Sequence, residues 1–262
     1  MKTSIIVIGF VLIITMLSGC IFDNSEDPTY YEILLENSDC DPLCKEEYIV
    51  LSNGFIMKKY SVEKEIIKNE IEMVKIDESK AKEAITFVQG LSIDPRENRC
   101  IECNEYTLLT IKNKAAFMFA DTEQNTPNDI KQIFEDSKQL FSTGVKQDDF
   151  FIQFVYKKIG QNSIDYHIFS NGSVLFEEFD DNIKLTNARV YDIEKEKIEF
   201  LKNIIEPEFF ESESSTRNCY TIGLDQGYIE VKKENYYAFI WTCGAEDSSA
   251  DKLFNTLIKE FG

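Results

Sequence analysis

The sequence is poor in histidine and in basic residues, and both shortages limit what the protein can do. His167 is the only histidine among 262 residues, so any catalytic device that depends on histidine has to include it. Lys and Arg number 28 against 47 Asp and Glu, which gives a formal net charge of −19. A field of that sign repels nucleic-acid phosphates and anionic lipid head groups. We therefore expect no nucleic-acid partner and no binding to membranes through surface charge.

Long apolar runs are missing as well, except near the N-terminus. Residues 5–17 are almost all apolar, follow Lys2, and lead into the small residues Ser18 and Gly19 before Cys20. A membrane-spanning helix needs about 20 apolar residues, and this run is shorter. The pattern is typical of a secretion signal, with an uncleaved anchor helix as the alternative.

The tetrapeptide Leu17-Ser18-Gly19-Cys20 resembles the lipobox of prokaryotic lipoproteins, and this resemblance covers residues 1–20. It implies a signal peptide over 1–19, cleavage before Cys20 and attachment of lipid to the Cys20 thiol. The partner of the mature N-terminus is then the membrane, and the body lies on the extracytoplasmic face of the cell membrane. Residues 20–29 are interpreted as the lipid anchor and a short linker.

From Tyr30 onward the chain contains two similar halves. Tyr48–Gly54 (YIVLSNG) resembles Tyr166–Gly172 (YHIFSNG), and later features follow in the same order in both halves. Asn-Gly between alternating apolar runs predicts a hairpin turn in which both turn residues have positive φ. The repetition predicts two tandem domains, over residues 30–145 and 146–262.

Each half is predicted to form an antiparallel sheet with two helices packed on one face, an α+β class. This plan resembles that of uncharacterised α+β domains in extracytoplasmic lipoproteins, a resemblance that implies no activity and no functional residue. The expected strands are Tyr31–Leu35, Tyr48–Leu51, Phe55–Val62, Glu72–Ile76, Tyr106–Ile111, Ala115–Phe119, Phe150–Tyr156, Ile164–Phe169, Val174–Phe179, Leu185–Tyr191, Tyr228–Val231 and Tyr236–Trp241. The expected helices run from Asp77 to Gly90, from Thr126 and Pro127 onward, from Glu194 to Ile205, and from Ser248 to the C-terminus.

Cysteine carries the most specific chemical hypothesis. Six cysteines besides Cys20 are an even number in an exported chain, which predicts three disulfides. We expect Cys219 to pair with Cys243. The remaining four are expected to pair between the two clusters, in either combination: Cys40 and Cys44 with Cys100 and Cys103. The alternatives are a closed zinc site made by these four thiolates, or a redox pair at Cys100 and Cys103.

Other polar and aromatic clusters have simpler interpretations. His167 is interpreted as a structural or surface residue in a strand. The acidic runs around Glu177 and Asp39 lack the ordered spacing of a calcium loop and are interpreted as solvated turns. Tyr236, Tyr237, Phe239 and Trp241 are expected to pack on the sheet or in the core. We therefore assign no catalytic residue, no metal ligand and no cofactor from the sequence.

These observations favour a binding or envelope-interaction module over an enzyme. The expected partner is an envelope protein or a small ligand in a groove between the two domains. The alternative is an extracytoplasmic thiol-redox or zinc protein that uses Cys40, Cys44, Cys100 and Cys103. A hydrolase is a third possibility, and it requires two buried acids with raised pKa values in the groove.

The disulfide hypothesis predicts that all six thiols of the form that starts after Cys20 resist alkylation until the protein is reduced. The measurement is the intact mass after alkylation, with and without reduction, together with a native mass for bound metal. One zinc bound by four thiols, or one pair partly reduced as isolated, would contradict the prediction.

Overall fold

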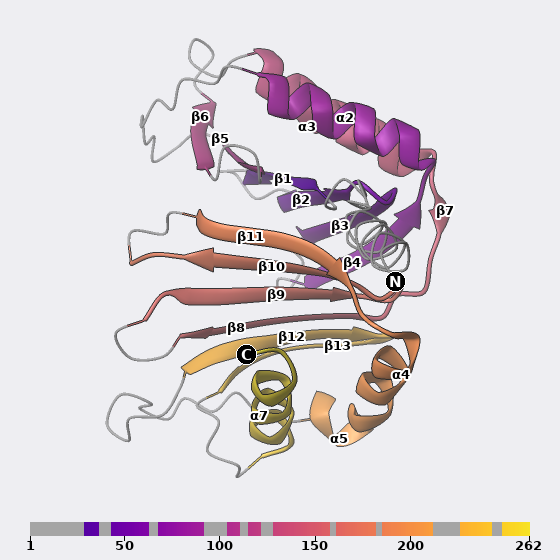
Figure 1. Ribbon diagram of the computed structural model, residues 1–262, viewed down its shortest axis with the longest axis vertical. Coiled ribbons are helices and arrows are strands. Elements are labelled where there is room, and N and C mark those ends of the chain that lie inside the picture. The colour runs from indigo at the N-terminus through magenta and orange to yellow at the C-terminus, as the bar shows by residue number, and fades with distance from the viewer. Residues whose placement is uncertain are drawn as a thin grey trace, which may run out of the picture.

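A computed structural model of the chain describes residues 29–36, 43–62, 68–91, 104–110, 115–121, 128–157, 161–181, 185–211, 226–242 and 248–262. Within these ranges the chain forms two antiparallel sheets and helices that cover their outer faces. One group of helices lies at each end of the molecule, with both sheets between them (Figure 1). The predicted α+β class with two antiparallel sheets is confirmed.

The first sheet has the strand order β6-β5-β1-β2-β3-β4-β7. Every neighbouring pair is antiparallel. Its strands are β1 (Tyr30–Glu36), β2 (Leu43–Leu51), β3 (Phe55–Val62), β4 (Lys68–Lys75), β5 (Asn104–Thr110), β6 (Ala115–Asp121) and β7 (Val145–Lys146).

The second sheet has the order β11-β10-β9-β8-β12-β13 and is also antiparallel throughout. When β8 is taken as the counterpart of β1, this strand order matches the order β4-β3-β2-β1-β5-β6 within the first sheet. The strands are β8 (Phe151–Lys157), β9 (Ser163–Phe169), β10 (Ser173–Phe179), β11 (Leu185–Asp192), β12 (Gln226–Lys233) and β13 (Tyr236–Thr242).

Helices α2 (Glu78–Gly90) and α3 (Asn128–Ser142) cover the outer face of the first sheet. Helix α2 begins after Asp77, whose side chain accepts a hydrogen bond from the Ser79 backbone N–H at 2.8 Å, the usual role of an N-cap. Three apolar residues of α2, spaced three or four apart, are buried against the sheet: Ala81, Ile85 and Val88. The expected start of α3 at Thr126 and Pro127 lies outside the described residues.

Helices α4 (Lys195–Ile204), α5 (Pro207–Phe210) and α7 (Ser249–Phe261) cover the outer face of the second sheet. The predicted start of α7 is confirmed, because the Ser248 hydroxyl accepts from the Asp251 backbone N–H at 3.1 Å. Lys233 Nζ donates to the carbonyls of Lys202 and Ile205 at 2.7 and 2.9 Å, which satisfies backbone acceptors at the end of α4.

The inner faces of the two sheets are in contact. A cluster of buried apolar side chains is shared between them and contains no helix residue. Tyr30, Phe55 and Met57 of the first sheet belong to it, as do Phe151 and Phe169 of the second, each at most 1% exposed. Where an open groove between the halves was expected, these strands therefore meet in a packed layer.

The two Asn-Gly hairpins form as predicted, but the predicted turn geometry is wrong. Each loop has three residues, and only the glycines Gly54 and Gly172 have positive φ, at 83° and 94°. Such loops combine an ordinary turn with a left-handed residue at its end. The asparagines instead use their side chains: Asn53 Oδ1 accepts from the Phe55 N–H at 3.1 Å, and Asn171 Oδ1 accepts from the Ser173 N–H at 3.0 Å.

Most differences from the expected elements are at their ends. Strands β2 and β4 begin five and four residues earlier than expected, and the short elements β7 and α5 were not predicted. Two-residue strands and one-turn helices contain too few positions for a periodic pattern to show. Among the described helices, none combines the length and the apolar character that crossing a membrane requires.

Replacing Gly54 with Ala should lower the free energy of unfolding by about 2 kcal/mol or more, because an L-residue is strained at positive φ. A Cβ at this position also meets the Ile76 carbonyl oxygen at 2.6 Å. The matched control is Gly90→Ala at the end of α2, where a Cβ meets nothing within 4 Å. Urea denaturation measures both, and equal effects of the two substitutions would contradict the account of the turn.

Candidate functional site

A group of charged and polar side chains lies on the inner faces of the sheets beside the apolar layer. We call it the inter-sheet polar cluster. In both sheets its members alternate along the strands with residues that face the helices, as the two-residue period of a strand requires. The cluster consists of Glu32, Glu47, Lys59, Gln153, Asp165, His167, Glu177 and Glu230.

Strand register places most of these residues at equivalent positions in the two sheets. Glu47 lies opposite Lys59 across β2 and β3, and Asp165 lies opposite Glu177 across β9 and β10. The two halves thus bring polar residues to matching places, but with different charges: Lys59 corresponds to Glu177.

The same correspondence applies one strand further along. Glu32 lies opposite Ile49 across β1 and β2, while Gln153 lies opposite His167 across β8 and β9. His167 therefore stands where the first half has an isoleucine. The histidine is peculiar to the second half of the cluster.

Lys59 and Glu230 form the well-paired side of the cluster. Lys59 Nζ forms an ion pair with Glu230, which is fully buried, and contacts Gln153 Oε1 at 3.4 Å. The Tyr237 hydroxyl donates to the second Glu230 oxygen at 2.5 Å. Burial by itself lowers the pKa of Lys59, but Glu230 and Glu47 outweigh it and raise that pKa above its usual value.

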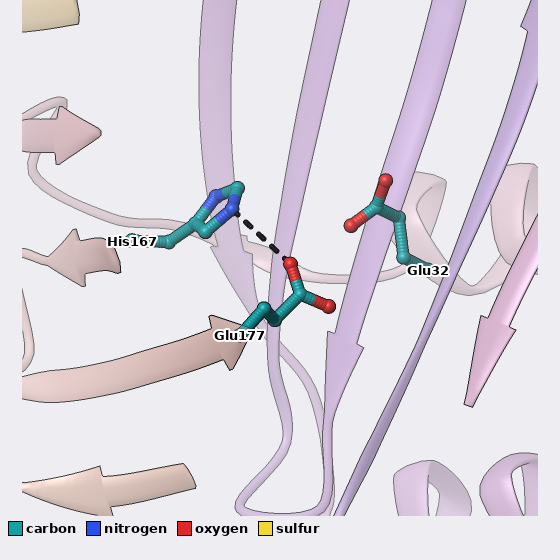
Figure 2. A group of neighbouring side chains, drawn as sticks. All are labelled: Glu32, His167 and Glu177. Atoms are coloured by element: carbon teal, nitrogen blue, oxygen red, sulfur yellow. Dashed lines mark ion pairs between the residues drawn. The ribbon is translucent and has the colours of Figure 1, made fainter. Parts of the chain in front are cut away.

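Glu32, His167 and Glu177 form the other side. Figure 2 shows their side chains converging, with Glu32 on a strand of the first sheet and the other two on strands of the second. One ligand atom from each of the three lies within 4.8 Å of the others. His167 Nε2 is 3.4 Å from Asp165 Oδ2 and 3.6 Å from Glu177 Oε2. The Tyr30 hydroxyl donates a hydrogen bond to Glu177.

This side is poorly satisfied by hydrogen bonds. His167 is 3% exposed, and within the described part of the chain neither of its ring nitrogens has a hydrogen-bond partner. The same holds for Asp165 Oδ1, whereas Asp165 Oδ2 accepts from Gln153 Nε2 at 2.7 Å. Buried polar atoms are paired in the great majority of cases, so unpaired ones point to a partner such as an ion or a water molecule.

The local charge is predominantly negative. The cluster has five carboxylates, against Lys59 and His167 as its basic members. Burial, together with Glu47 and Glu177, raises the pKa of Glu32 well above its usual value. Burial lowers the pKa of His167, but the carboxylates of Asp165 and Glu177 outweigh it and raise that pKa well above normal. In this environment protons compensate part of the excess negative charge.

The sequence interpretation of these residues needs correction. Glu177 was placed in a solvated turn but is 2% exposed in β10, whereas His167, interpreted as either structural or on the surface, is buried. Glu32, Glu47, Asp165 and Glu230 were missed altogether. A charged residue at every second strand position is the usual sign of a solvent-facing side, and here that side is covered by a second sheet.

The cysteines cannot be placed with the cluster. Cys20, Cys40, Cys100, Cys103, Cys219 and Cys243 lie outside the described residues. Cys44 lies in β2, and only its backbone is described. The disulfide, zinc and redox hypotheses for these thiols therefore stay predictions.

A second candidate surface is aromatic. Alternation along β13 places Phe239 and Trp241 on the same side of the second sheet as Glu230, next to Tyr228 of β12. The three rings contact one another, with centroids 5.0, 5.3 and 5.9 Å apart, and we call them the aromatic face. Phe239 and Trp241 are 39% and 53% exposed, so of the two expected places for them, the sheet face and the core, they occupy the sheet face.

A third feature is a groove of about 480 Å³ between α2 and α3. Apolar side chains form much of its wall, with Lys80, Glu83 and Asp136 among its polar residues. Phe87, which is 50% exposed, lies at its edge. The groove is remote from the polar cluster, because α2 and α3 cover the opposite face of the first sheet.

Comparison with known protein families and with curated proteins gives no match to this chain.

The pair of Lys59 and Glu230 can be tested by a double-mutant cycle. Lys59→Met should lower the free energy of unfolding by about 3–5 kcal/mol, because it leaves the buried Glu230 carboxylate uncompensated. Adding Glu230→Gln should recover a large part of that loss. Lys157→Met, which breaks an ion pair with the 80% exposed Asp181, should cost less than about 1 kcal/mol. Additive effects of Lys59→Met and Glu230→Gln in urea denaturation would contradict the pairing.

Proposed function

We propose that the protein is a lipid-anchored, extracytoplasmic binding module, and that its aromatic face holds an extended, basic segment of another envelope protein. The observation that carries this proposal is the exposure of Phe239 and Trp241 on β13. Contiguous exposed aromatic groups mark interaction surfaces more often than isolated apolar residues do. Tyr and Trp are also the side chains that contribute most to binding energy at interfaces.

The position of β13 supports an extended ligand. Among the described strands β13 has one neighbour, β12, and it ends the order of the second sheet. A strand at the edge of a sheet can bind an extended peptide through backbone hydrogen bonds, while alternate side chains of the peptide meet the face of the sheet. The aromatic face would then contact every second residue of the segment.

Charge supports a basic segment. The chain has a formal net charge of −19, which attracts Lys- and Arg-rich partners over distance. At short range Lys and Arg bind favourably over the faces of Trp and Tyr rings. The structure contains such contacts internally, as where Lys58 Nζ lies 4.7 Å from the centroid of the Tyr60 ring.

Anchoring is proposed from the Leu17–Cys20 tetrapeptide. Lipid on Cys20 would hold the body close to the membrane, since the linker up to residue 29 spans roughly 30 Å even when fully extended. The partner is then a protein of the same membrane or of the adjacent envelope layer. A tethered module of this kind gains affinity from its high local concentration at the surface.

The proposal predicts site-specific cross-linking in the native envelope. A photo-reactive residue replacing Phe239 should form a defined adduct, and the same replacement at Phe200 of α4, which is 44% exposed, should not. Adding Trp241→Ala should reduce the yield of the adduct formed at position 239 at least about tenfold. The segment of the partner that forms the adduct, synthesised as a peptide, should bind the protein. Replacing the Lys and Arg residues of this peptide with Gln should abolish that binding.

Two results would contradict the proposal. Equal adducts at positions 239 and 200 would show that the aromatic face has no specific partner. A Cys20→Ser variant that stays in the membrane fraction as firmly as the unchanged protein would remove the basis for lipid anchoring.

A further inference from the structure

We propose that Glu32, Asp165, His167 and Glu177 form a binding site for one divalent transition-metal ion between the two sheets. The site is independent of the aromatic face and of the cysteines. Its ligands come from three strands: β9 for Asp165 and His167, β10 for Glu177, which follows β9 in a hairpin, and the sequence-distant β1 for Glu32.

The geometry is close to that of a metal site. One ligand atom each from Glu32, His167 and Glu177 lies within 4.8 Å of the other two. Zinc binds nitrogen and oxygen ligands at about 2.0–2.2 Å, so two ligand atoms of one tetrahedral ion lie roughly 3.5 Å apart. His167 Nε2 is already 3.4 Å from Asp165 and 3.6 Å from Glu177. Small side-chain rotations would complete the arrangement.

The unpaired nitrogens of His167 are the second, independent observation. Its ring is 3% exposed, Nε2 faces the carboxylates, and no hydrogen bond to either nitrogen is found in the described part of the chain. Leaving a buried polar atom without a hydrogen bond costs about 1–3 kcal/mol, and an ion bound by Nε2 would remove that cost for this nitrogen. The distances from Nε2 to both carboxylates are longer than a hydrogen bond and suit an ion held between the three groups.

Charge compensation points to a cation. Glu32, Asp165 and Glu177 bring three carboxylates to one place, and the nearby Lys59 ammonium is bound by Glu230. Buried carboxylates that are not compensated by positive charge are costly, and they take up protons or coordinate metals. A divalent ion neutralises two of the three carboxylates directly.

The donor set selects the class of metal. One imidazole nitrogen with carboxylate oxygens is a ligand combination of Zn²⁺, Mn²⁺ or Fe²⁺, whereas Ca²⁺ and Mg²⁺ prefer oxygen ligands alone. Access is available from one side, since the Glu32 side chain is partly exposed and that of Asp165 is 14% exposed. The ion would also link the two sheets, because Glu32 belongs to the first and the other three ligands to the second.

The first experiment uses Zn²⁺ as the probe with the full-length protein in detergent. Titration should show one equivalent bound at this site, and X-ray absorption at the zinc edge should show nitrogen and oxygen neighbours at about 2.0–2.1 Å with imidazole scattering. A first shell of sulfur at about 2.3 Å would assign the ion to cysteine and overturn the proposal. So would the absence of zinc uptake.

Variants then locate the site. His167→Gln and Glu177→Gln should each weaken zinc binding more than about 100-fold, beyond the effect of losing an outer-shell partner. Glu46→Gln is the matched control, because Glu46 is also a buried carboxylate but lies on the helix-covered face of the first sheet, where it pairs with Lys58 at 2.9 Å, so the affinity should stay within about twofold. Equal weakening by all three substitutions would overturn the proposal.

A stability readout covers the case in which His167→Gln fails to fold. Zinc at about 100 times its Kd should raise the Tm of the unchanged protein by roughly 5–10 °C. It should do the same for Glu46→Gln and raise the Tm of Glu177→Gln by at most about 1–2 °C, because a site weakened 100-fold is then only about half occupied. A Tm of Glu177→Gln that rises with zinc as far as in the unchanged protein would refute the site, whatever happens to His167→Gln. Trp241→Ala should leave zinc binding unchanged, which separates this proposal from that of the aromatic face.

Discussion

The structure depends on how charge is accommodated where two sheets close on each other. Each sheet is covered by helices on one face and by the other sheet on the second face, so the inner faces have little contact with water except at β13, where the aromatic face is exposed. Such a layer is normally apolar, yet this one contains eight polar or charged residues beside its apolar part. Each of them needs a hydrogen-bonding or charged partner, and the partners that cross between the sheets fix how the two halves pack.

The two sides of the polar cluster meet this requirement differently. On one side Lys59 crosses from the first sheet to Glu230 and Gln153 of the second, and the Tyr237 hydroxyl completes the coordination of Glu230. On the other side three carboxylates surround one histidine whose nitrogens are unpaired in the described part of the chain. The first arrangement is complete with the protein's own groups. The second has the composition of a site that takes an ion.

Much of the fold could be predicted from the sequence, because the signals are local. Alternation in YIVLSNG and YHIFSNG places β2, β9 and their turns, and the stripe from Ala81 to Val88 places α2. The turn type was wrong because Asn53 and Asn171 use side-chain hydrogen bonds where positive φ was expected. These bonds are made with the N–H groups of Phe55 and Ser173, the first residues of the next strands. The turn type therefore depends on the following strand as well as on the Asn-Gly pair.

The candidate site could not be predicted in the same way. Glu32 is far in the sequence from His167 and Glu177, and each of the three lies on a strand whose alternation is compatible with a solvent-facing side. Whether that side meets water or another sheet is a tertiary property, and a single strand carries no signal for it. One hint was available: His167 and Ile49 occupy equivalent places in the repeated segment, which indicates that the position can be buried.

The difference between the halves also favours packing of one half on the other over packing of two second halves together. Packing two second halves together would bring Asp165, Glu177 and Glu230 of both to one interface without Lys59. Such an arrangement is disfavoured by several uncompensated carboxylates. With Lys59 at the place that corresponds to Glu177, the first half supplies a cation where the second half needs one. Specificity between two similar halves thus follows from a small number of substitutions on faces that are otherwise alike.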